Sequence, residues 1–250
     1  MLAYFKKYGI RDHRGGGRAS ARETAVRVAG GAFAQLLLNE FKIEVLSGVL
    51  GIGKAISDKV DFDFAQNSQI YALGNEEAMK EAVNKARSEH DSVGAVVLSV
   101  AKGVPAGLGE PLYDRLDSAL AAALMGINGV KAVEIGAGVN VSSMLGSANN
   151  DEMDELGFLS NNAGGILGGI SSGAEIVLKS HFKPTPSIFK EQKTLNLAGE
   201  AVDFELRGRH DPCIGIRGSV VATAMIRLVL ADMLLLNAST KLENLKKIYG

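Results

Sequence analysis

The sequence predicts an α+β fold in a single domain that spans residues 1–250. Segments with a helical period alternate with short apolar or alternating segments typical of strands, some of them placed as in hairpins. Neither an internal repeat nor a linker divides the chain, and 46% hydrophobic residues are enough for one sizeable core. We therefore expect one α+β domain with buried helices.

The first predicted helix runs from Thr24 to about Phe41, and a strand follows it. Ser20 is a good N-cap, and Glu23, three residues later, completes a Ser-x-x-Glu capping box. Because most side chains of this helix are apolar, we expect it to be largely buried. Over residues 41–50, apolar residues alternate with Lys and Glu, which favours a strand.

The middle of the chain continues the alternation of helices and strands. Residues 76–90 are polar with a helical pattern, and residues 93–104 are apolar on both faces at their centre, as in a buried strand. Residues 111–127 are amphipathic and open with Pro111, a residue that suits the first position of a helix. Residues 130–135 predict a short strand.

The last part of the chain begins with a long irregular segment. Residues 136–173 are rich in Gly, Ser and Asn without a sustained period, and such a loop is usually functional or disordered. Residues 175–183 alternate cleanly and stop before Pro184, which predicts a strand. We expect another strand over residues 201–207 and a strongly apolar helix over residues 220–236.

Composition limits the classes of partner. Lys and Arg number 27 against 28 Asp and Glu, and this balance argues against a nucleic-acid binder. The single cysteine, Cys213, excludes an intrachain disulfide and a Cys-based zinc site, and the histidines lack metal-ligand spacing, so we expect no metal. The N-terminal residues lack the apolar run of a secretion signal, and no segment approaches a membrane-spanning length. We expect no membrane partner and a cytoplasmic protein.

Two basic, glycine-bearing clusters stand out, at residues 11–24 and 207–217. Buried charges are costly unless they are paired, so such clusters suggest an anionic ligand with proton chemistry nearby. The two clusters could line one pocket.

In the first cluster, three glycines and Arg18 come directly before the start of a helix. Free backbone N–H groups and the positive end of the helix dipole favour an anion there, and Ser20 could add a hydrogen bond to a phosphate. The alternative is a glycine-bearing loop with a capped helix and solvated arginines, which we rank somewhat behind. The spacing is neither that of a Walker A loop nor Gly-x-Gly-x-x-Gly.

In the second cluster, His210 and Asp211 could supply a proton donor and acceptor, with Arg209 and Arg217 fixing a carboxylate or phosphate. The alternative is an ion-pair network at the end of a strand. Cys213 is better explained as a small buried thiol than as a nucleophile.

Two further stretches carry weaker signals. Paired glycines in residues 160–173 permit close approach to a flat ligand or a second chain, but a plain bulged loop is equally compatible. Residues 183–187, with two prolines between Lys, Thr and Ser, suit a cofactor phosphate or ring edge. For this pentapeptide alone, a stiff surface turn is the favoured interpretation.

Taken together, these stretches resemble the chorismate synthase family. The segments that carry the resemblance occur in the family's order and cover nearly the whole chain: residues 11–24, 107–111, 133–136, 161–171, 183–185 and 208–213. Several long motifs in register are far more specific than any one of them.

The resemblance implies an enzyme of the shikimate pathway of aromatic amino acid biosynthesis. It would convert 5-enolpyruvylshikimate-3-phosphate to chorismate and phosphate by an anti-1,4-elimination that needs reduced FMN without net redox change. It also implies a homotetramer whose protomers sandwich helices between antiparallel sheets. Whether the enzyme reduces its own FMN with NADP or relies on an outside reductase stays open, because no NAD(P)H fingerprint is present.

The resemblance also assigns residues. Asp211, with His210, would handle a proton near the flavin N5, while Arg209 and Arg14 would face substrate anions. The FMN contacts carry over to Arg18, Ala19, Ser20, Asn128, Gly129, Gly168, Lys183, Pro184, Thr185, Pro186, Ser187 and Arg209.

The chain departs from the family pattern at four positions in or next to the matched motifs. The family usually has Tyr at His13, Ser at Ala19, Asp at Ala137 and Ser at Pro186. The changes at Ala19 and Pro186 remove hydroxyls but leave backbone contacts, so we expect tuning of FMN affinity at most.

The larger departure is that family members carry a segment before residue 7 with a Gly-Glu-Ser-His-Gly motif, two acid histidines and substrate arginines. We expect this chain alone to be inactive or severely impaired, and the alternative function is an FMN-binding or assembly module. A generic nucleotide-binding protein ranks well behind.

Overall fold

The fold is built on one antiparallel sheet, seen in a computed structural model that describes residues 2–12, 14–196, 198–206, 208 and 210–250. Five strands form the sheet in the order β2-β1-β3-β9-β4, and every neighbouring pair is antiparallel. The strands are β2 (Ala55–Ile56), β1 (Glu44–Ile52), β3 (Ala95–Lys102), β9 (Ile176–Phe182) and β4 (Val130–Ile135).

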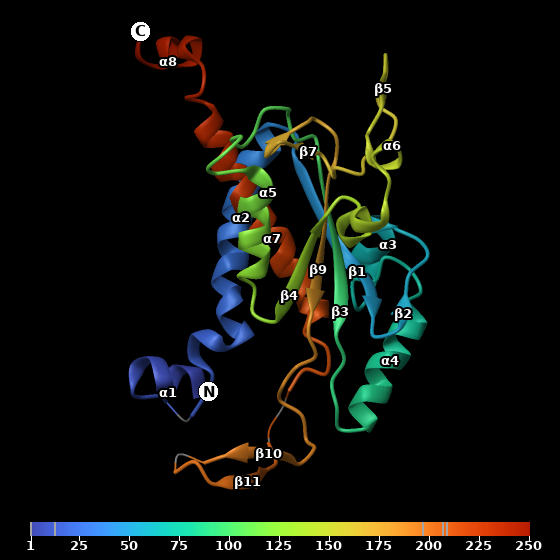
Figure 1. The fold of residues 1–250 in the computed structure, drawn as a ribbon, viewed down its shortest axis with the longest axis vertical. Coiled ribbons are helices and arrows are strands. Elements are labelled where there is room, and N and C mark those ends of the chain that lie inside the picture. Colours follow the sequence, from blue (N-terminus) through green and yellow to red (C-terminus); the bar gives the residue numbers. More distant parts are fainter. Residues whose placement is uncertain (1, 13, 197, 207, 209) are drawn as a thin grey trace.

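Three helices form a layer beside the sheet, and two others lie away from that layer (Figure 1). The layer consists of α2 (Thr24–Glu40), α5 (Leu116–Met125) and α7 (Gly215–Asn237), of which α7 packs against β1, β3, α2 and α5. The shorter α3 (Phe62–Asn67) and α4 (Glu76–Ser88) pack against β1 and β2. The sheet and the helix layer thus enclose the main core.

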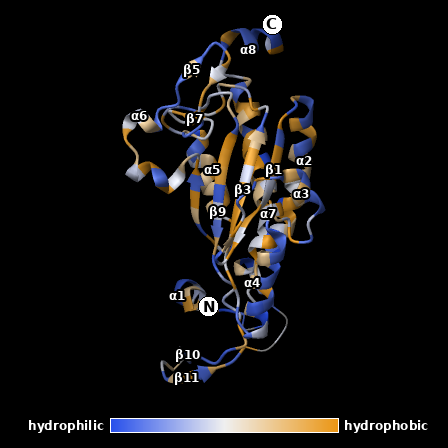
Figure 2. Cartoon of the chain, turned by 90° about the vertical axis from the view of Figure 1, so that its right-hand side faces the viewer, coloured by the Kyte–Doolittle hydropathy of each residue, from blue (hydrophilic) through white to orange (hydrophobic). Residues whose placement is uncertain are grey.

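Alternation along the strands decides which side chains enter this core. In β9, Leu178 and Phe182 are buried against the helices, whereas Lys179 and His181 between them are half-buried on the other face. Figure 2 shows the consequence in hydropathy: the central strands are largely hydrophobic, whereas α4 is largely hydrophilic.

The helices of the layer approach each other closely at Gly31. A Cβ atom built on Gly31 would lie 2.5 Å from the Ala224 Cβ and 2.9 Å from the Ala224 carbonyl oxygen. Helix α2 and helix α7 therefore meet backbone to backbone at this point, which only a glycine permits.

Most predicted elements are confirmed, with shifted ends. The strand at residues 130–135 coincides with β4, and the helices predicted over residues 76–90 and 220–236 correspond to α4 and α7. The strand predicted over 41–50 is β1, displaced toward higher numbers, and those over 93–104 and 175–183 are β3 and β9, shorter at both ends. The strand predicted over 201–207 is β11 (Ala201–Phe204).

The predicted helix start at Pro111 is wrong. Helix α5 begins only at Leu116, because Gly109 (φ +95°) and Asp114 (φ +52°) adopt left-handed backbone conformations that a helix excludes. Residues 107–115 form a turn instead. The Gly109 conformation is fixed by crowding, since a Cβ there would lie 2.4 Å from the Gly169 carbonyl oxygen.

The capping box at the start of α2 is half correct. The Ser20 hydroxyl accepts a hydrogen bond from the Arg22 N–H at 3.4 Å and caps a short 3-10 turn, η2 (Ala21–Glu23), that leads into α2. The Glu23 carboxylate does not accept the second hydrogen bond of the box, from the Ser20 N–H, because it pairs with Arg27 at 2.8 Å. The Ser20 N–H donates to the Gly17 carbonyl instead.

Helix α2 is also less buried than its composition predicts. Only Thr24, Gly31 and Leu38 are buried along it, whereas Val26 is 78% and Phe33 is 76% exposed. One face of α2 packs on α7, and within the described residues its opposite apolar face is uncovered.

Several short elements escaped prediction. The segment 136–173, expected as a loop, contains a 3-10 turn, a short helix and two hairpins. The additional elements are α1 (Leu2–Tyr8), η1 (Gly17–Ala19), η3 (Gly138–Ser143), α6 (Gly146–Asn149), β5 (Met153–Asp154), β6 (Gly157–Phe158), β7 (Ile166–Leu167), β8 (Ile170–Ser171), β10 (Gln192–Leu195) and α8 (Leu242–Tyr249). Strands β10 and β11 form a hairpin that projects from the body (Figure 1).

The prediction that no segment approaches a membrane-spanning length is wrong as well. Helix α7 has 23 residues and is apolar enough, by length and composition, to cross a membrane. Its packing gives a different reason for that composition, because ten of its residues are buried between the sheet and the neighbouring helices. The composition of α7 is that of the central core helix.

Candidate functional site

Three segments far apart in the sequence meet at one end of the sheet. Arg18 lies in η1, just before α2, while Asn128 and Gly129 connect α5 to β4. The Asn128 Nδ2 donates to the Arg18 carbonyl oxygen at 3.3 Å, and the Lys183 N–H donates to the Gly129 carbonyl oxygen at 2.9 Å. The structure thus brings together these four predicted site residues, at the lower end of the sheet in Figure 1.

Gly129 is held at this junction by its backbone and its surroundings. Its φ of +99° is strained for any side chain, and a Cβ there would lie 2.4 Å from the Ile214 Cδ1. Because Ile214 belongs to the second basic cluster, Gly129 lies against that cluster as well.

The segment after β9 is anchored by Ser92, which lies in the connection between α4 and β3. The Ser92 hydroxyl donates to the Thr185 carbonyl oxygen at 2.7 Å, which anchors the predicted stretch Lys183, Pro184, Thr185, Pro186 and Ser187. The Thr185 Oγ1 is buried and has no hydrogen-bond partner among the described residues. A buried polar atom without a hydrogen-bond partner is unusual in a folded protein, and a bound ligand is one kind of group that can supply the partner.

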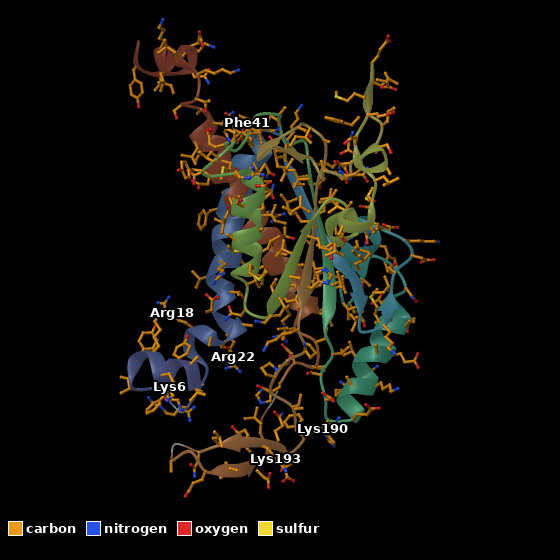
Figure 3. All side chains as sticks on the ribbon, in the orientation of Figure 1. Lys6, Arg18, Arg22, Phe41, Lys190 and Lys193 are labelled. Atoms are coloured by element: carbon orange, nitrogen blue, oxygen red, sulfur yellow. The ribbon has the colours of Figure 1, made fainter. Side chains whose placement is uncertain are left out.

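Arg14 and Arg18 line one cavity of about 930 Å³ between α1 and the loop that precedes α2. Arg14 makes a bidentate pair with Asp12, with Nη2 2.9 Å from Oδ2, and this hydrogen bonding raises the pKa of the Arg14 guanidinium above its usual value. Figure 3 shows Arg18 at the start of α2 on the side of α1. The cavity is lined by Tyr4, Tyr8, Ile10, Arg11, Asp12, Arg14 and Arg18.

The second cluster precedes α7. The Asp211 carboxylate pairs with Arg217 at 3.0 Å, and the Arg217 side chain is 71% exposed. For Arg217, the structure therefore agrees with the alternative interpretation of this stretch, an ion-pair network. The His210 ring packs on Phe189 with 5.8 Å between ring centroids, and its Nε2 is buried without a partner among the described residues. His210 is thereby held in place with one ring nitrogen unused.

Cys213 is buried, as expected of an inert thiol, and desolvation raises its pKa. Among the described residues, no three His, Cys, Asp or Glu side chains gather closely enough to hold a metal ion. Arg209, predicted to contact both FMN and substrate, lies outside the described residues, as do His13 and Arg207.

Gly168, a predicted FMN contact, lies away from the end of the sheet where Arg18, Asn128 and Lys183 meet. It lies in the turn between β7 and β8, before β9 begins, whereas Lys183 follows the other end of β9. Seven residues of strand separate the two points by about 20 Å. The hydrogen bond from the Leu116 N–H to the Gly169 carbonyl at 2.8 Å also puts this turn at the start of α5, and Asn128 follows the end of α5.

Sequence reasoning missed two groups of side chains. Phe189 and His90 stack edge to face beside His210, with 6.4 Å between their ring centroids. Asp151 organises the glycine-rich loop, because its carboxylate accepts hydrogen bonds from the Ser160 hydroxyl and from the Asn162 and Ala163 N–H groups at 2.6–2.8 Å. No local pattern indicates contacts between residues so far apart; an acidic residue ahead of a glycine-rich loop was the only signal for Asp151.

The comparison with protein families identifies the family to which the chain belongs. The family model for chorismate synthase matches residues 2–235 of the chain. The chain belongs to the chorismate synthase family.

Relatives and a solved structure agree with this family. A protein named chorismate synthase from Campylobacter concisus (strain 13826) is 98% identical over 249 residues, which cover 100% of this chain and 70% of that protein. Another from Campylobacter jejuni (strain ATCC 700819) is 59% identical over 255 residues, with 100% and 70% covered.

A crystal structure titled as chorismate synthase matches with a TM-score of 0.78 and 31% identity, over 97% of this chain and 73% of that one. This structural likeness confirms the α+β class predicted from the sequence.

Proposed function

We propose that this protein catalyses the anti-1,4-elimination of phosphate from 5-enolpyruvylshikimate-3-phosphate to give chorismate, with reduced FMN as cofactor, an activity that we expect to be severely impaired in these 250 residues alone. Membership of the chorismate synthase family supports the activity. The observation that carries the site is the junction in which Asn128 binds the Arg18 carbonyl and Lys183 binds the Gly129 carbonyl.

The residues at this junction fit a phosphorylated, flat cofactor. Thr185 Oγ1 is a buried polar atom without a partner among the described residues, and it stands on the segment that follows Lys183. His210 Nε2 is likewise buried without a partner among them, and its ring packs on Phe189, four residues after Thr185. Gly15 and Gly17 leave the loop beside Arg18 open, since a Cβ on either would meet no atom within 4 Å. Reduced FMN, when bound, would supply electron density to the carbon that loses phosphate and recover it afterwards.

The arginines would bind the anionic groups of the substrate. Arg14 and Arg18 line the same cavity, and the Asp12 carboxylate orients the Arg14 guanidinium through two bonds. Guanidinium groups suit phosphate and carboxylate oxygens, because they offer a planar fork of N–H donors. These residues would hold the phosphate as it leaves.

Asp211 would accept and hand on the proton that the elimination releases. Its Oδ2 lies 3.0 Å from the Arg217 Nη1, so this ion pair holds the carboxylate in place beside His210. His210, one residue away and fixed by Phe189, presents the unpartnered Nε2 for a hydrogen bond to substrate or cofactor.

We also propose a cytoplasmic homotetramer formed from one domain per chain. The uncovered apolar face of α2, with Val26 and Phe33, supports association with further protein surface. The position of Gly168, far from the other predicted FMN contacts of the same chain, is consistent with sites that draw on a second copy. Light scattering after size-exclusion chromatography measures the mass directly, and a monomer at micromolar concentration would contradict the tetramer.

The activity is tested by anaerobic turnover with photoreduced FMN and 5-enolpyruvylshikimate-3-phosphate. We expect release of inorganic phosphate together with chorismate from a chain extended by the residues that the Campylobacter concisus relative has in addition, and at most slow release from these 250 residues alone. In the extended chain, Asp211→Asn should lose about 10²-fold or more of kcat, since a proton-transfer group contributes about 10²–10⁴-fold. Asp203→Asn, on the exposed hairpin strand β11, is the matched control and should leave the rate unchanged.

Two outcomes separate this proposal from its alternative. In the extended chain, FMN and substrate binding without phosphate release would refute the enzyme and favour an FMN-binding or assembly module. Equal losses in Asp211→Asn and Asp203→Asn would refute the role of Asp211 while leaving the activity intact.

A further inference from the structure

A second cavity, of about 430 Å³, lies away from the junction described above. It opens where the last turns of α2, the start of β1, α3 and the middle of α7 come together. Figure 3 shows Phe41, the residue that ends α2, at the opposite end of this helix from Arg18 and Arg22. The lining residues are Gln35, Asn39, Lys42, Ile43, Glu44, Val45, Leu46, Gln66 and Arg227.

Arg227 is the unusual residue of this cavity. It stands in the apolar part of α7, directly after the fully buried Ile226, and its Nε is buried without a hydrogen-bond partner. One guanidinium nitrogen, Nη2, donates to the Val45 carbonyl at 3.4 Å. A buried charged donor without an acceptor is unfavourable, so the guanidinium is expected to meet one.

No carboxylate of the described residues provides that acceptor. Burial lowers the pKa of Arg227, and Glu44 opposes this shift only through its charge. Lys42 lines the same cavity and adds a second positive charge. The cavity therefore offers two cationic side chains and one carboxylate.

Gln35 supplies a complementary group. Its Oε1 is buried without a partner among the described residues, and its amide nitrogen donates a hydrogen bond to the Asn39 Oδ1. An occupant that satisfies both orphan atoms must present an acceptor to the Arg227 Nε and a donor to the Gln35 Oε1. A carboxylate that carries a hydroxyl or amino donor has both, and a guanidinium fork matches the two oxygens of a carboxylate.

We infer that the cavity around Arg227 and Gln35 binds a carboxylate group with an adjacent hydrogen-bond donor. The carboxylate can come from a small free acid or from a side chain of further polypeptide. The second source has a route of entry, because β2 pairs with β1 only at Gly51 and Ile52 and leaves the edge of β1 beside Val45 open.

The test observes the orphan atom itself. In the ¹⁵N-labelled chain, the Nε–Hε signal of Arg227 is assigned by its loss in Arg227→Lys and then followed during titration with acetate, lactate and inorganic phosphate at constant ionic strength. We expect a saturable shift with both carboxylates and a dissociation constant about fivefold lower for lactate, which adds one neutral hydrogen bond. Phosphate should bind more weakly than lactate.

Matched variants distinguish a site from a general effect of anions. Arg227→Lys keeps the charge but loses the fork, and we expect at least about tenfold weaker binding of lactate, measured by its thermal stabilisation of the chain. Arg87→Lys, whose exposed guanidinium binds Asn84 at 3.1 Å, should behave as the parent chain. Melting without ligand shows that each variant is folded.

A longer chain, extended by the residues that the Campylobacter concisus relative has in addition, distinguishes the two sources. If a free acid is the ligand, both chains respond to lactate; if a side chain fills the cavity, the Arg227 signal of the longer chain is already shifted and lactate changes nothing. Absence of a saturable shift in the shorter chain, or equal binding by the parent and Arg227→Lys, would overturn the inference. Neither result depends on whether the chain forms chorismate.

Discussion

Two adjacent glycines of α2 allow a sharp test of how the helix layer packs. A Cβ built on Gly31 would lie 2.5–2.9 Å from the Cβ, Cα and carbonyl oxygen of Ala224, whereas a Cβ on Gly30 would lie 3.6 Å from the nearest atom of Leu228. The first contact involves backbone, which cannot yield without moving α7, and the second is an ordinary van der Waals contact. Gly30→Ala and Gly31→Ala therefore differ only in what the new methyl group meets.

The magnitudes follow from two opposing effects. Replacing glycine by alanine within a helix contributes about 0.5–1 kcal/mol to the free energy of unfolding, so Gly30→Ala should be more stable than the parent by this amount. Overpacking a filled core costs about 1–3 kcal/mol, and the contact with Ala224 backbone places Gly31→Ala near the upper value, with a net loss of about 2 kcal/mol.

Thermal unfolding followed by circular dichroism measures the difference. A separation of about 2–3 kcal/mol between the variants corresponds to about 4–12 °C in Tm for a chain of this size. The double variant Gly31→Ala with Ala224→Gly should recover part of the loss, because it removes the Ala224 Cβ but not the backbone atoms. If Gly31→Ala melts as high as Gly30→Ala, the close approach of α2 and α7 described above is refuted.

Two further predictions concern carboxylates that hold backbone segments in place. Burial would raise the pKa of Asp151, but hydrogen bonds from Ser160, Ala163 and Asn162 outweigh it and lower that pKa. Asp151→Asn should cost the loop about 1–3 kcal/mol, seen as at least about tenfold faster hydrogen exchange at the Asn162 and Ala163 amides; unchanged exchange would exclude this role. Burial likewise opposes ionisation of Glu134, yet His181 at 2.7 Å and Lys179 at 3.4 Å lower its pKa. A carboxyl group with a lowered folded pKa stabilises above its unfolded value, about 4.3, and this stability is lost as the pH falls through the folded pKa. Urea unfolding of Glu134→Gln should therefore show lower stability at pH 7 and a smaller loss on acidification, and an acid dependence equal to that of the parent chain would contradict the assignment.

The secondary structure was predictable where burial imposes a period. The strand β9 follows its alternation closely, because one of its faces meets the helices. The start of α5 was not predictable from Pro111, since the Leu116 N–H donates to the distant Gly169 carbonyl and a side chain on Gly109 would collide with that carbonyl. The burial of α2 could not be inferred from its composition, because apolar residues are present on its covered and uncovered faces alike.

The candidate site was predictable in its residue types but not in its geometry. A basic loop before a helix indicated an anion at Arg18, and the structure places Arg14 on the same cavity. The contact of Arg18 with Asn128 spans 110 positions, and nothing local to either residue indicates it; the family resemblance alone did so. The same resemblance groups Gly168 with these residues, whereas the chain places it at the far end of β9.

The hydrogen bond between the Asn128 amide and the Arg18 carbonyl has a consequence for how the protein matures. Because the two partners of this hydrogen bond are 110 positions apart in the sequence, the junction exists only after the intervening strands and helices have assembled. A newly made polypeptide would thus acquire affinity for its ligands late and all at once. Any molecule that occupies the junction would then protect the whole assembled chain against unfolding, not one local element.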